Sequence, residues 1–315
     1  MKVLVTGGAG YIGSVVASQL LDADHDVVVL DDLSTGHADA VDGRAAFVKG
    51  TLREQARPVL ASGGFDAVLH FAAKSLVGES VERPDVYWDG NLGETLALLD
   101  AMRATGVKKI VFSSTAAVYG EPETVPITED APARPGNPYG ATKLAIDVAL
   151  TEFARLNGFG AVSLRYFNVA GAHGALAERH AVETHLIPNV LRAAVTDEPV
   201  SVFGSDYSTA DGTCVRDYIH VTDLGRAHLL ALAVCEPGAH MIYNLGNGAG
   251  YSVQEVIEVC RQVTGRPIAA MDAPRRPGDP DVLIASSEAI RADLGWEPVL
   301  GLTTMVEDAW REFPR

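Results

Sequence analysis

The first fourteen residues constrain the fold of this chain more than any other stretch. The apolar run Lys2–Thr6 is typical of a buried strand, and it leads into a glycine-rich turn and then into apolar residues at helical spacing. Gly8, Gly10 and Gly13 give G-x-G-x-x-G, and Gly7 gives an overlapping G-x-x-G-x-x-G. Such a strand, turn and helix let main-chain N–H groups approach a pyrophosphate. The pattern predicts a dinucleotide-binding unit.

A second strand, 27–30, ends on Asp31 and Asp32, about 20 residues after the glycines. An acidic residue at this distance hydrogen-bonds the ribose 2′-hydroxyl of a dinucleotide and repels a 2′-phosphate. The sequence therefore predicts NAD as the cofactor rather than NADP.

Charge and cysteine content exclude several classes of function. The 315 residues include 25 basic and 41 acidic ones, a formal net charge of −16, which argues against nucleic acid or an anionic membrane as partner. Cys214, Cys235 and Cys260 form no C-x-x-C pair, so we expect neither a disulfide framework nor a metal site. No apolar run is typical of a signal peptide or a membrane span, and we expect a cytoplasmic protein.

Strand and helix patterns alternate through the first half of the chain. Buried strands are predicted at 45–48, 66–71, 109–112 and 162–167, and helices at 89–105 and 139–156. This alternation predicts an α/β fold, a doubly wound parallel sheet of Rossmann type, with ligands at the carboxyl ends of the strands.

The regular alternation of strand and helix patterns ends after residue 167, where polar loops separate shorter helices and strands. The segment 215–220, a helix at 222–234 and a strand at 241–245 are expected to return to the large sheet. We therefore predict an NAD-binding Rossmann domain of residues 1–167 plus about 215–247. Residues of about 168–214 plus 248–315 are predicted to form a smaller, discontinuous α/β lobe that binds substrate.

Three side chains form a candidate catalytic set. Tyr139 and Lys143 lie at i and i+4 of the predicted helix, on one face. A tyrosine is a weak base, but a lysine cation and a nicotinium charge nearby favour its phenolate. Thr115, at the end of the strand that begins at 109, adds a hydroxyl that can bind a substrate oxygen.

With these residues in place, the chain resembles the extended short-chain dehydrogenase/reductase family nearly end to end. The motifs that carry the resemblance are Thr6–Ser14, His70–Ala73, Val77–Ser80, Phe112–Gly120, Arg165–Asn168, Glu183–Pro188, Asp211–His220 and Pro274–Asp279. The resemblance implies that tightly held NAD⁺ takes hydride from C4 of a UDP-sugar while tyrosine takes the hydroxyl proton. Hydride then returns to the other face of the 4-keto sugar, which interconverts UDP-galactose and UDP-glucose.

The resemblance also implies a role for each matching position. Tyr139 would be the base, Lys143 its activator and the ribose anchor, and Thr115 the hydroxyl partner that also touches substrate. NAD would be lined by Gly7, Gly10, Tyr11, Ile12, Gly13, Asp31, Asp32, Leu33, Ser34, Thr35, Gly36, Thr51, Leu52, Phe71, Ala72, Ala73, Asn91 and Phe167. The UDP-sugar would be held by Asn168, His185, Leu186, Ile187, Phe203, Arg216, Tyr218, Arg276, Asp279 and Leu283.

Three positions bear on specificity. Many relatives carry aspartate where Thr51 stands, so we expect a weaker or main-chain contact to adenine. Some carry lysine at Ser75, so a charge near the nicotinamide is absent. Leu283 stands where a tyrosine closes the sugar pocket, which favours some activity on UDP-N-acetylglucosamine. An epimerase for that sugar, or for both, is the alternative function.

Two other functions fit less well. A nucleotide-sugar 4,6-dehydratase needs acidic residues after the strand-terminal threonine, and here Ala116 and Ala117 occupy those positions. A redox-sensing regulator without catalysis would not need Tyr139 and Lys143. The helices 91–102 and 139–156 are apolar on more than one face, which together with the resemblance predicts a homodimer.

Overall fold

The computed structural model describes residues 1–276 and 278–314; Pro277, part of the motif 274–279, and Arg315 lie outside the described residues. Its contacts divide the chain into two compact units. Unit 1 comprises 1–120, 133–165 and 225–243, and unit 2 comprises 121–132, 166–224 and 244–315. Unit 2 thus includes 121–132, 166–167, 215–224 and 244–247, which the predicted domains assign to the dinucleotide-binding part. The functional assignment of the two domains stays a prediction.

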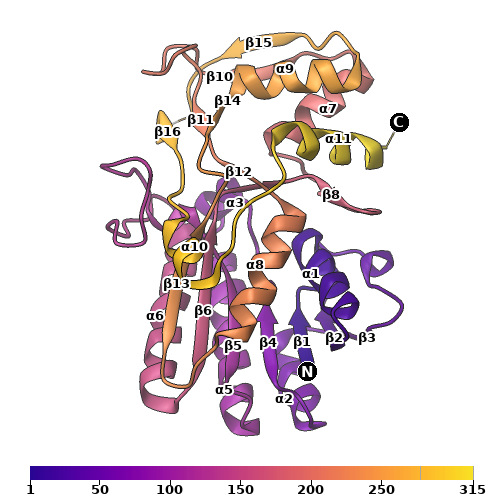
Figure 1. Ribbon diagram of the computed structural model, residues 1–315, viewed down its shortest axis with the longest axis vertical. Coiled ribbons are helices and arrows are strands. Elements are labelled where there is room, and N and C mark those ends of the chain that lie inside the picture. The colour runs from indigo at the N-terminus through magenta and orange to yellow at the C-terminus, as the bar shows by residue number, and fades with distance from the viewer. Residues whose placement is uncertain (277, 315) are drawn as a thin grey trace. The chain divides into compact units, whose positions relative to one another are not determined.

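Unit 1 is built on a seven-stranded sheet in the order β13-β6-β5-β4-β1-β2-β3 (Figure 1). The strands are β1 Lys2–Thr6, β2 Asp26–Asp31, β3 Ala46–Lys49, β4 Ala67–His70, β5 Lys109–Thr115, β6 Gly160–Tyr166 and β13 His240–Leu245. The pairs from β3 to β5 are parallel, with Val5 opposite both Val29 and Leu69. The direction of winding reverses between β1 and β4, which is where doubly wound sheets bind ligands. The predicted fold class is confirmed for this unit.

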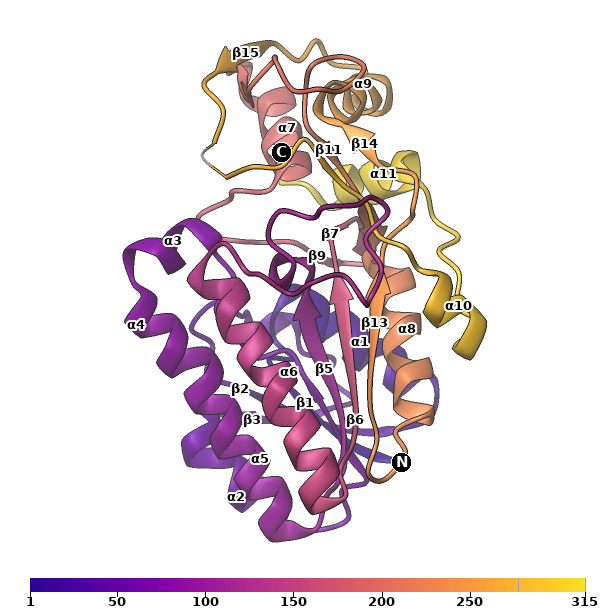
Figure 2. The same ribbon diagram turned by 90° about the vertical axis from the view of Figure 1, so that its left-hand side faces the viewer.

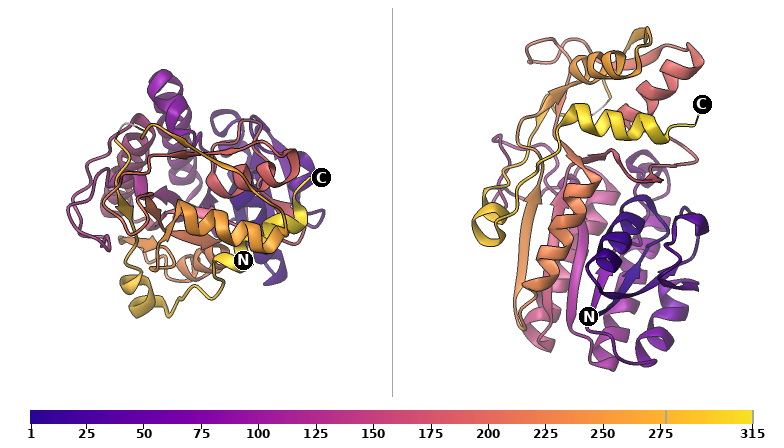
Figure 3. Two further views of the ribbon diagram at one scale, coloured as in Figure 1. Left: turned by 90° about the horizontal axis from the view of Figure 1, so that it is seen from above. Right: turned by 45° about the vertical axis from the view of Figure 1, so that its right-hand side comes forward.

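Helices cover both faces of this sheet. α2, α5 and α6 lie on one face, with α5 and α6 side by side (Figure 2), and α1 lies with the later part of α8 on the other (Figure 3, right). Their bounds are α1 Tyr11–Asp22, α2 Leu52–Ala61, α5 Glu94–Thr105, α6 Pro138–Asn157 and α8 Val221–Ala233. Between β4 and α5 come α3 Val77–Glu82, α4 Pro84–Tyr87 and a π-helix, Trp88–Gly93.

The inward face of α5 differs from the prediction. The sequence predicts Leu92, Leu96 and Leu99 on the sheet and Leu98 and Met102 partly outside. Leu98, Leu99 and Met102 are instead buried, whereas 41% of Leu96 is exposed. The inward stripe runs through Thr95 at spacings of three and four residues, and Leu92 lies in the π-helix, where the helical period changes. The prediction was therefore right for Leu99 and for Leu92, which packs against the same core, and wrong for Leu96, Leu98 and Met102.

Unit 2 combines short strands with four helices among its described residues, in addition to the first residues of α8. The strands are β7 Asn168–Ala170, β8 Ala172–His173, β9 Leu176–Ala177, β10 Val200–Phe203, β11 Val215–Arg216, β12 Tyr218–His220, β14 Tyr251–Ser252, β15 Ala270–Ala273 and β16 Val282–Leu283. The helices are α7 Leu186–Thr196, α9 Val253–Thr264, α10 Glu288–Leu294 and α11 Leu302–Glu312. α7, α9 and α11 share a core that contains Val190, Ile257 and Met305 (Figure 3).

The segment 215–220 does not join the large sheet, which corrects the prediction; 241–245 does, as β13. β11 pairs with β14 and β16, and β12 pairs with β7. The division falls at Asp217, whose buried carboxylate accepts N–H groups from Asn247, Gly248 and Ala285. These bonds join two further segments of unit 2, 247–248 and the residue Ala285, to Asp217. Among the described residues, no helix is both long and apolar enough to cross a membrane.

Candidate active site

The glycine turn after β1 is held by contacts that only glycine permits. Gly7 has φ of +73°, donates its N–H to Leu30 O and lies so close to Ala72 that a Cβ would be 2.5 Å from Ala72 N. A Cβ on Gly13 would lie 2.2 Å from Gly7 O. α1 then begins at Tyr11 with Gly10 as its N-cap, and no side chain caps it. Gly7, Gly10, Tyr11, Ile12 and Gly13 thus lie together at the carboxyl end of β1, in an arrangement that fits a pyrophosphate.

Asp31 ties the end of β2 to this turn. Its carboxylate accepts N–H groups from Ala9 at 3.0 Å and Leu33 at 2.8 Å. Burial raises the pKa of Asp31, and the two main-chain N–H groups partly oppose that rise. A carboxylate offers about four acceptor sites, so two hydrogen bonds leave capacity for a ribose diol.

The loop after Asp31 folds back onto the glycine turn. Asp32 accepts the N–H of Ser34 at 2.8 Å, and Leu33 adopts a left-handed φ of +62°. Gly36 packs against Ala9, and His37 N donates to Ala9 O. Ser34 and Thr35 are exposed. The structure therefore brings the predicted residues 31–36 together with 7–13.

Thr51 and Leu52 have visible structural roles. Thr51 is the N-cap of α2 and accepts the N–H of Glu54 at 3.3 Å, and Leu52 is buried in the core of unit 1. Thr51 therefore serves as a helix cap, and its predicted contact with adenine stays a prediction.

Asn91 holds the end of β4 against α6. Its amide accepts the N–H of Lys74 at 2.8 Å and donates to Lys74 O and to Thr142 Oγ1, both at 3.1 Å. Phe71 N and Ala72 N both donate to Thr6 O, and Ala73 follows them. Asn91 is fully buried, so its amide fixes the segment 71–74 beside the helix that carries Lys143. Sequence analysis assigned Asn91 to NAD and missed these protein partners.

His70 is a buried group to which sequence analysis gave no role, although it stands in the motif 70–73. Its ring nitrogens lie 2.7 Å from Thr6 Oγ1 and 2.8 Å from Thr95 Oγ1. Burial, assisted by the charge on Lys143, lowers the pKa of His70 to about 3. A neutral imidazole therefore bridges β1 and α5 behind the glycine turn.

The three predicted catalytic side chains lie together at the carboxyl end of β5. Asn137 caps α6 by accepting the N–H of Gly140 at 2.8 Å, which places Tyr139 in the first turn. The Tyr139 hydroxyl hydrogen-bonds to Thr115. Lys143 Nζ donates to Ser113 O at 2.8 Å and lies 5.9 Å from the centre of the Tyr139 ring.

The electrostatics of this set differ from the expectation. Burial raises the pKa of Tyr139, and the hydrogen bond with Thr115 only partly opposes it. Burial lowers the pKa of Lys143 to about 7, against the attraction of Asp147. Desolvation therefore dominates both pKa shifts, opposed by the Thr115 hydrogen bond at Tyr139 and by the charge of Asp147 at Lys143.

A buried ion pair lies along α6, one turn beyond Lys143. Asp147 Oδ2 accepts from Arg165 Nε at 3.0 Å and from Arg165 Nη2 at 2.9 Å, and Arg165 Nη1 donates to the Tyr119 hydroxyl at 3.0 Å. The side chains of Arg165 and Asp147 are only 6% and 3% exposed. Sequence analysis missed this pair, although Asp147 follows Lys143 at the same i+4 spacing that relates Lys143 to Tyr139.

In unit 2, two predicted substrate residues, Asn168 and Tyr218, face each other across the strand pair β7 and β12, next to Phe167, which is predicted to line NAD. Asn168 Nδ2 donates to Asp217 O at 2.9 Å, and Tyr218 is buried opposite Asn168. Phe167 N donates to Leu245 O at 3.4 Å. Asp217, missed by sequence analysis although it stands inside the motif 211–220, fixes this group.

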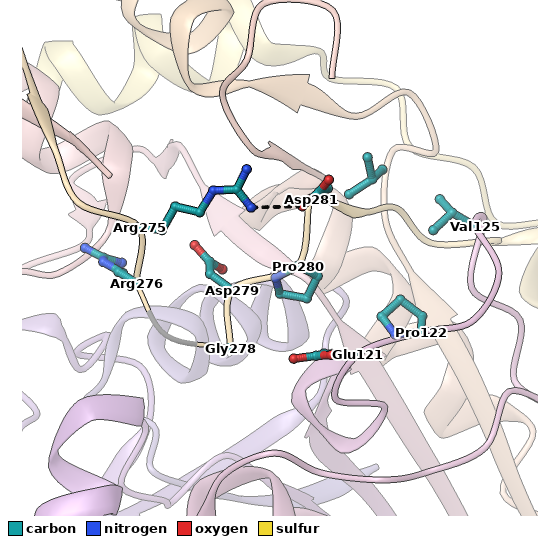
Figure 4. A pocket seen from close by; sticks show the side chains of 10 residues that line it. Glu121, Pro122, Val125, Arg275, Arg276, Gly278, Asp279, Pro280 and Asp281 are labelled. Atoms are coloured by element: carbon teal, nitrogen blue, oxygen red, sulfur yellow. Dashed lines mark ion pairs between the residues drawn. The ribbon is translucent and has the colours of Figure 1, made fainter. Parts of the chain in front are cut away.

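The charged candidates of unit 2 pair with one another. Arg216 donates to Asp279, and the Arg276 guanidinium stacks 4.1 Å from the centre of the Phe203 ring. Leu283 lies opposite Arg216 in the β11–β16 pair. Arg276 and Asp279 also line a hollow of about 610 Å³ (Figure 4). The other residues that line it are Glu121, Pro122, Val125, Arg275, Gly278, Pro280, Asp281 and Val282.

His185, Leu186 and Ile187 begin α7. His185 is the N-cap residue, and its Nδ1 lies 2.8 Å from Glu183 Oε1. Although burial lowers the pKa of His185, the carboxylates of Glu178 and Glu183 raise it to about 10. Ile187 is buried, and Leu186 is partly buried against the same core.

The chain is similar to known proteins over nearly its whole length. The model of the NAD dependent epimerase/dehydratase family matches residues 3–246. The chain belongs to this family. A UDP-glucose 4-epimerase of Corynebacterium glutamicum is 58% identical over 312 residues, which cover 98% of this chain and 95% of that protein. The UDP-glucose 4-epimerase of Streptomyces lividans is 56% identical over 313 residues and covers 98% and 95%.

Solved structures of the family agree with this fold. A crystal structure of a UDP-glucose 4-epimerase has a TM-score of 0.95 at 46% identity, covering 99% of this chain and 97% of that chain. The UDP-glucose 4-epimerase of Bifidobacterium longum in complex with NAD⁺ and UDP has a TM-score of 0.93 at 38% identity, covering 99% and 98%. Family and fold thus confirm the resemblance inferred from the sequence.

Proposed function

We propose that this chain is an NAD-dependent epimerase that interconverts UDP-galactose and UDP-glucose at C4 of the sugar. The observation that carries the proposal is the Tyr139, Thr115 and Lys143 set, in a chain 56–58% identical to two UDP-glucose 4-epimerases over nearly its whole length. These two relatives do not favour the alternative function, an epimerase for UDP-N-acetylglucosamine or for both sugars.

Residues of unit 1 would hold the cofactor. The turn 7–13 suits the pyrophosphate, the Asp31 carboxylate suits the adenosine ribose, and the segments 32–36, 51–52 and 71–73 flank them. Phe167 is assigned to the same cofactor by its position in the motif 165–168. NAD⁺, when bound, accepts a hydride from C4 and returns it. Asn91 contributes by fixing 71–74 rather than by offering a free amide.

Tyr139 moves the proton in this proposal. As the C4–H bond breaks, the Tyr139 oxygen takes the proton of the C4 hydroxyl, and a 4-keto sugar remains. The Thr115 hydroxyl, already hydrogen-bonded to Tyr139, orients that oxygen. Lys143 stabilises the phenolate by its charge and anchors a ribose. Return of the proton and hydride to the opposite face completes epimerisation, and alanines at 116 and 117 provide no acid for loss of water.

Residues of unit 2 would hold the UDP-sugar. Arg216 and Arg276 suit the diphosphate because a guanidinium binds phosphate in a bidentate manner, and Asp279 suits a ribose diol. Since Arg216 and Asp279 pair with each other, ligand binding exchanges that contact for contacts to substrate. Asn168, His185, Leu186, Ile187, Phe203, Tyr218 and Leu283 complete the proposed pocket.

We further propose a homodimer formed through α5 and α6. Leu96 on α5 and Val148 on α6 are 41% and 58% exposed, on helices that lie side by side (Figure 2). Exposed apolar side chains on neighbouring helices favour a second copy of the chain as partner. Sedimentation should give a dimer, and a monomer of 33.3 kDa at micromolar concentration would contradict this proposal.

The three buried free cysteines support a reducing compartment such as the cytoplasm.

The direct test is conversion of UDP-galactose to UDP-glucose by purified protein without added NAD. The reaction has no net redox change, so bound cofactor should suffice for many turnovers, and denaturation should release nucleotide at near one per chain. An enzyme that consumes NAD in each cycle, or that releases NADP, would contradict the proposal.

A further inference from the structure

A compact cluster of metal-ligating side chains lies in unit 2, immediately before α7. Its members, which we call the Glu–His cluster, are Glu178, His180, Glu183 and His185. The sequence of this segment repeats Glu-x-His twice, separated by two residues. Four candidate ligands within eight residues need little additional chain ordering to converge.

The donor atoms of the Glu–His cluster face one another. One ligand atom from each side chain lies within 4.8 Å of all the others. His180 Nδ1 is 3.1 Å from Glu178 Oε1 and 3.7 Å from Glu183 Oε2. His185 Nδ1 is 2.9 Å from Glu178 Oε1 and 2.8 Å from Glu183 Oε1. Each imidazole nitrogen thus faces both carboxylates.

These separations suit a tetrahedral cation. Bonds of roughly 2.0–2.2 Å from zinc to nitrogen and oxygen imply donor atoms about 3.3–3.6 Å apart in a tetrahedron. Three of the nitrogen–oxygen separations, 2.8–3.1 Å, are shorter than this range, one, 3.7 Å, is longer, and all four donor atoms lie within 4.8 Å of one another. Small rotations of four side chains would therefore create the site.

Burial and hydrogen bonding supply a second observation. The side chains of Glu178 and Glu183 are only 9% and 11% exposed, which is unusual for carboxylates at a loop. His180 Nδ1 is shielded from solvent and makes no hydrogen bond of acceptable geometry, despite the carboxylate 3.1 Å away. A shielded imidazole nitrogen without such a bond is a natural metal ligand.

The chemistry of the set selects a class of cation. Two carboxylates balance the charge of a divalent ion when both imidazoles are neutral. Imidazole nitrogen suits Zn²⁺, Co²⁺ and related transition metals, whereas Mg²⁺ and Ca²⁺ prefer oxygen alone. Four protein ligands leave no open position, as in structural zinc sites.

We propose that Glu178, His180, Glu183 and His185 bind one divalent transition-metal cation, with Zn²⁺ as the best match. The cation would join the end of β9 to the first residue before α7. It would thereby fix the start of the helix that carries Leu186 and Ile187. The site shares His185 with the proposed UDP-sugar pocket, but metal content and the Co²⁺ spectrum test it without an activity assay, so its failure is distinguishable from failure of the proposed function.

The test uses the full-length protein, stripped with a chelator and dialysed. Titration with Zn²⁺ should give one ion per chain and a higher melting temperature, and Mg²⁺ should give neither. Co²⁺ should produce the intense visible absorption of a tetrahedral complex. Fewer than about 0.1 Zn²⁺ per chain, or a weak octahedral Co²⁺ spectrum, would overturn the proposal and leave protonated histidines paired with the carboxylates.

Variants identify the ligands. Glu178→Gln and His180→Gln should each weaken Zn²⁺ binding at least about 10-fold and abolish the tetrahedral spectrum. His173→Gln, which changes a histidine of the same unit outside the Glu–His cluster, should bind Zn²⁺ as the wild type does. Circular dichroism checks that each variant folds, and the wild-type Co²⁺ spectrum needs no variant. Unchanged Zn²⁺ affinity in His180→Gln would overturn the proposal by showing binding elsewhere.

Discussion

The candidate residues of unit 1 and unit 2 are held by different kinds of contact. In unit 1, Lys143 donates to a main-chain carbonyl, Tyr139 meets a neutral hydroxyl, and Asn91 is saturated by protein partners. In unit 2, Arg216 is paired with Asp279, and the Arg276 guanidinium stacks on an aromatic ring. The first set is fixed by the fold, and the second set is held by contacts that a ligand can replace.

This difference separates two ways of building a site. Groups that perform chemistry must keep their geometry, so they are placed on buried strands and capped helices. Groups that grip an anionic ligand need a compensating partner before it arrives, because an unpaired charge in a partly buried place is costly.

The largest effect is expected for Tyr139→Phe. The variant keeps the ring but loses the proton acceptor, so turnover should fall by about 10²–10⁴-fold, while the melting temperature changes little. Steady-state conversion of UDP-galactose measures it. Tyr87→Phe is the matched control, since this buried ring lies edge-on to Tyr139 at 6.5 Å and its hydroxyl bonds only protein groups. Equal losses in both variants would remove Tyr139 from its proposed role.

Arg165→Met should lower the free energy of unfolding by about 3–5 kcal/mol, because Asp147 is then left buried without its partner. Arg216→Met should cost less, roughly 1–2 kcal/mol, since the side chains of Arg216 and Asp279 are 14% and 26% exposed and water can reach the remaining carboxylate. Urea unfolding compares the two variants. The double variant Asp147→Leu/Arg165→Met should recover much of the loss, and equal costs for the two arginines would break the contrast between the units.

Lys143 should make stability depend on pH. Its pKa in the folded chain, about 7, lies below its ordinary value of 10.5, so between these values the unfolded state binds more protons. The free energy of unfolding should therefore rise with pH, by up to about 1.4 kcal/mol per unit from this group. In Lys143→Met this contribution is absent. Unfolding at pH 7, 8 and 9 measures the free energy of unfolding of both proteins. The value for the variant minus that for the wild type should fall as pH rises, because only the wild type gains stability from deprotonation of Lys143.

Arg276→Lys should raise KM for the UDP-sugar roughly 10-fold with a smaller change in kcat, because lysine loses the bidentate contact to phosphate. Arg275→Lys is the neighbouring control: Arg275 stacks on Tyr207 and pairs with Asp206 and Asp281. A similar KM in both variants would show that Arg276 does not bind the diphosphate as proposed.

Local patterns predicted much of the fold. The glycine turn, the strand alternation and the helix that begins beside Tyr139 follow from short-range spacing, and each appears close to its predicted bounds. The set of Tyr139, Lys143 and Thr115 was also predictable, since i and i+4 share a helix face and a strand end lies at the ligand edge. Each of these features follows from the residue types within one short stretch of the sequence.

Long-range contacts were not predictable in this way. Nothing local to Asp217 indicates that its carboxylate would accept N–H groups from residues 30 and 68 positions further on. The ion pair of Arg216 and Asp279 likewise joins residues 63 positions apart. The error at 215–220 has the same origin, because this segment pairs with β7, β14 and β16, strands that are distant from it in sequence.

The π-helix Trp88–Gly93 makes the position of Tyr87 depend on the number of residues as well as on their identity. Removing one residue from this segment would let α4 and α5 continue as one regular α-helix. α4, which carries Tyr87, would then rotate by about 100° and shift by about 1.5 Å relative to α5. Tyr87 would leave its edge-on place beside Tyr139, and Asn91 would lose Lys74. Scanning by substitution would miss this dependence, whereas scanning by single-residue deletion would reveal it.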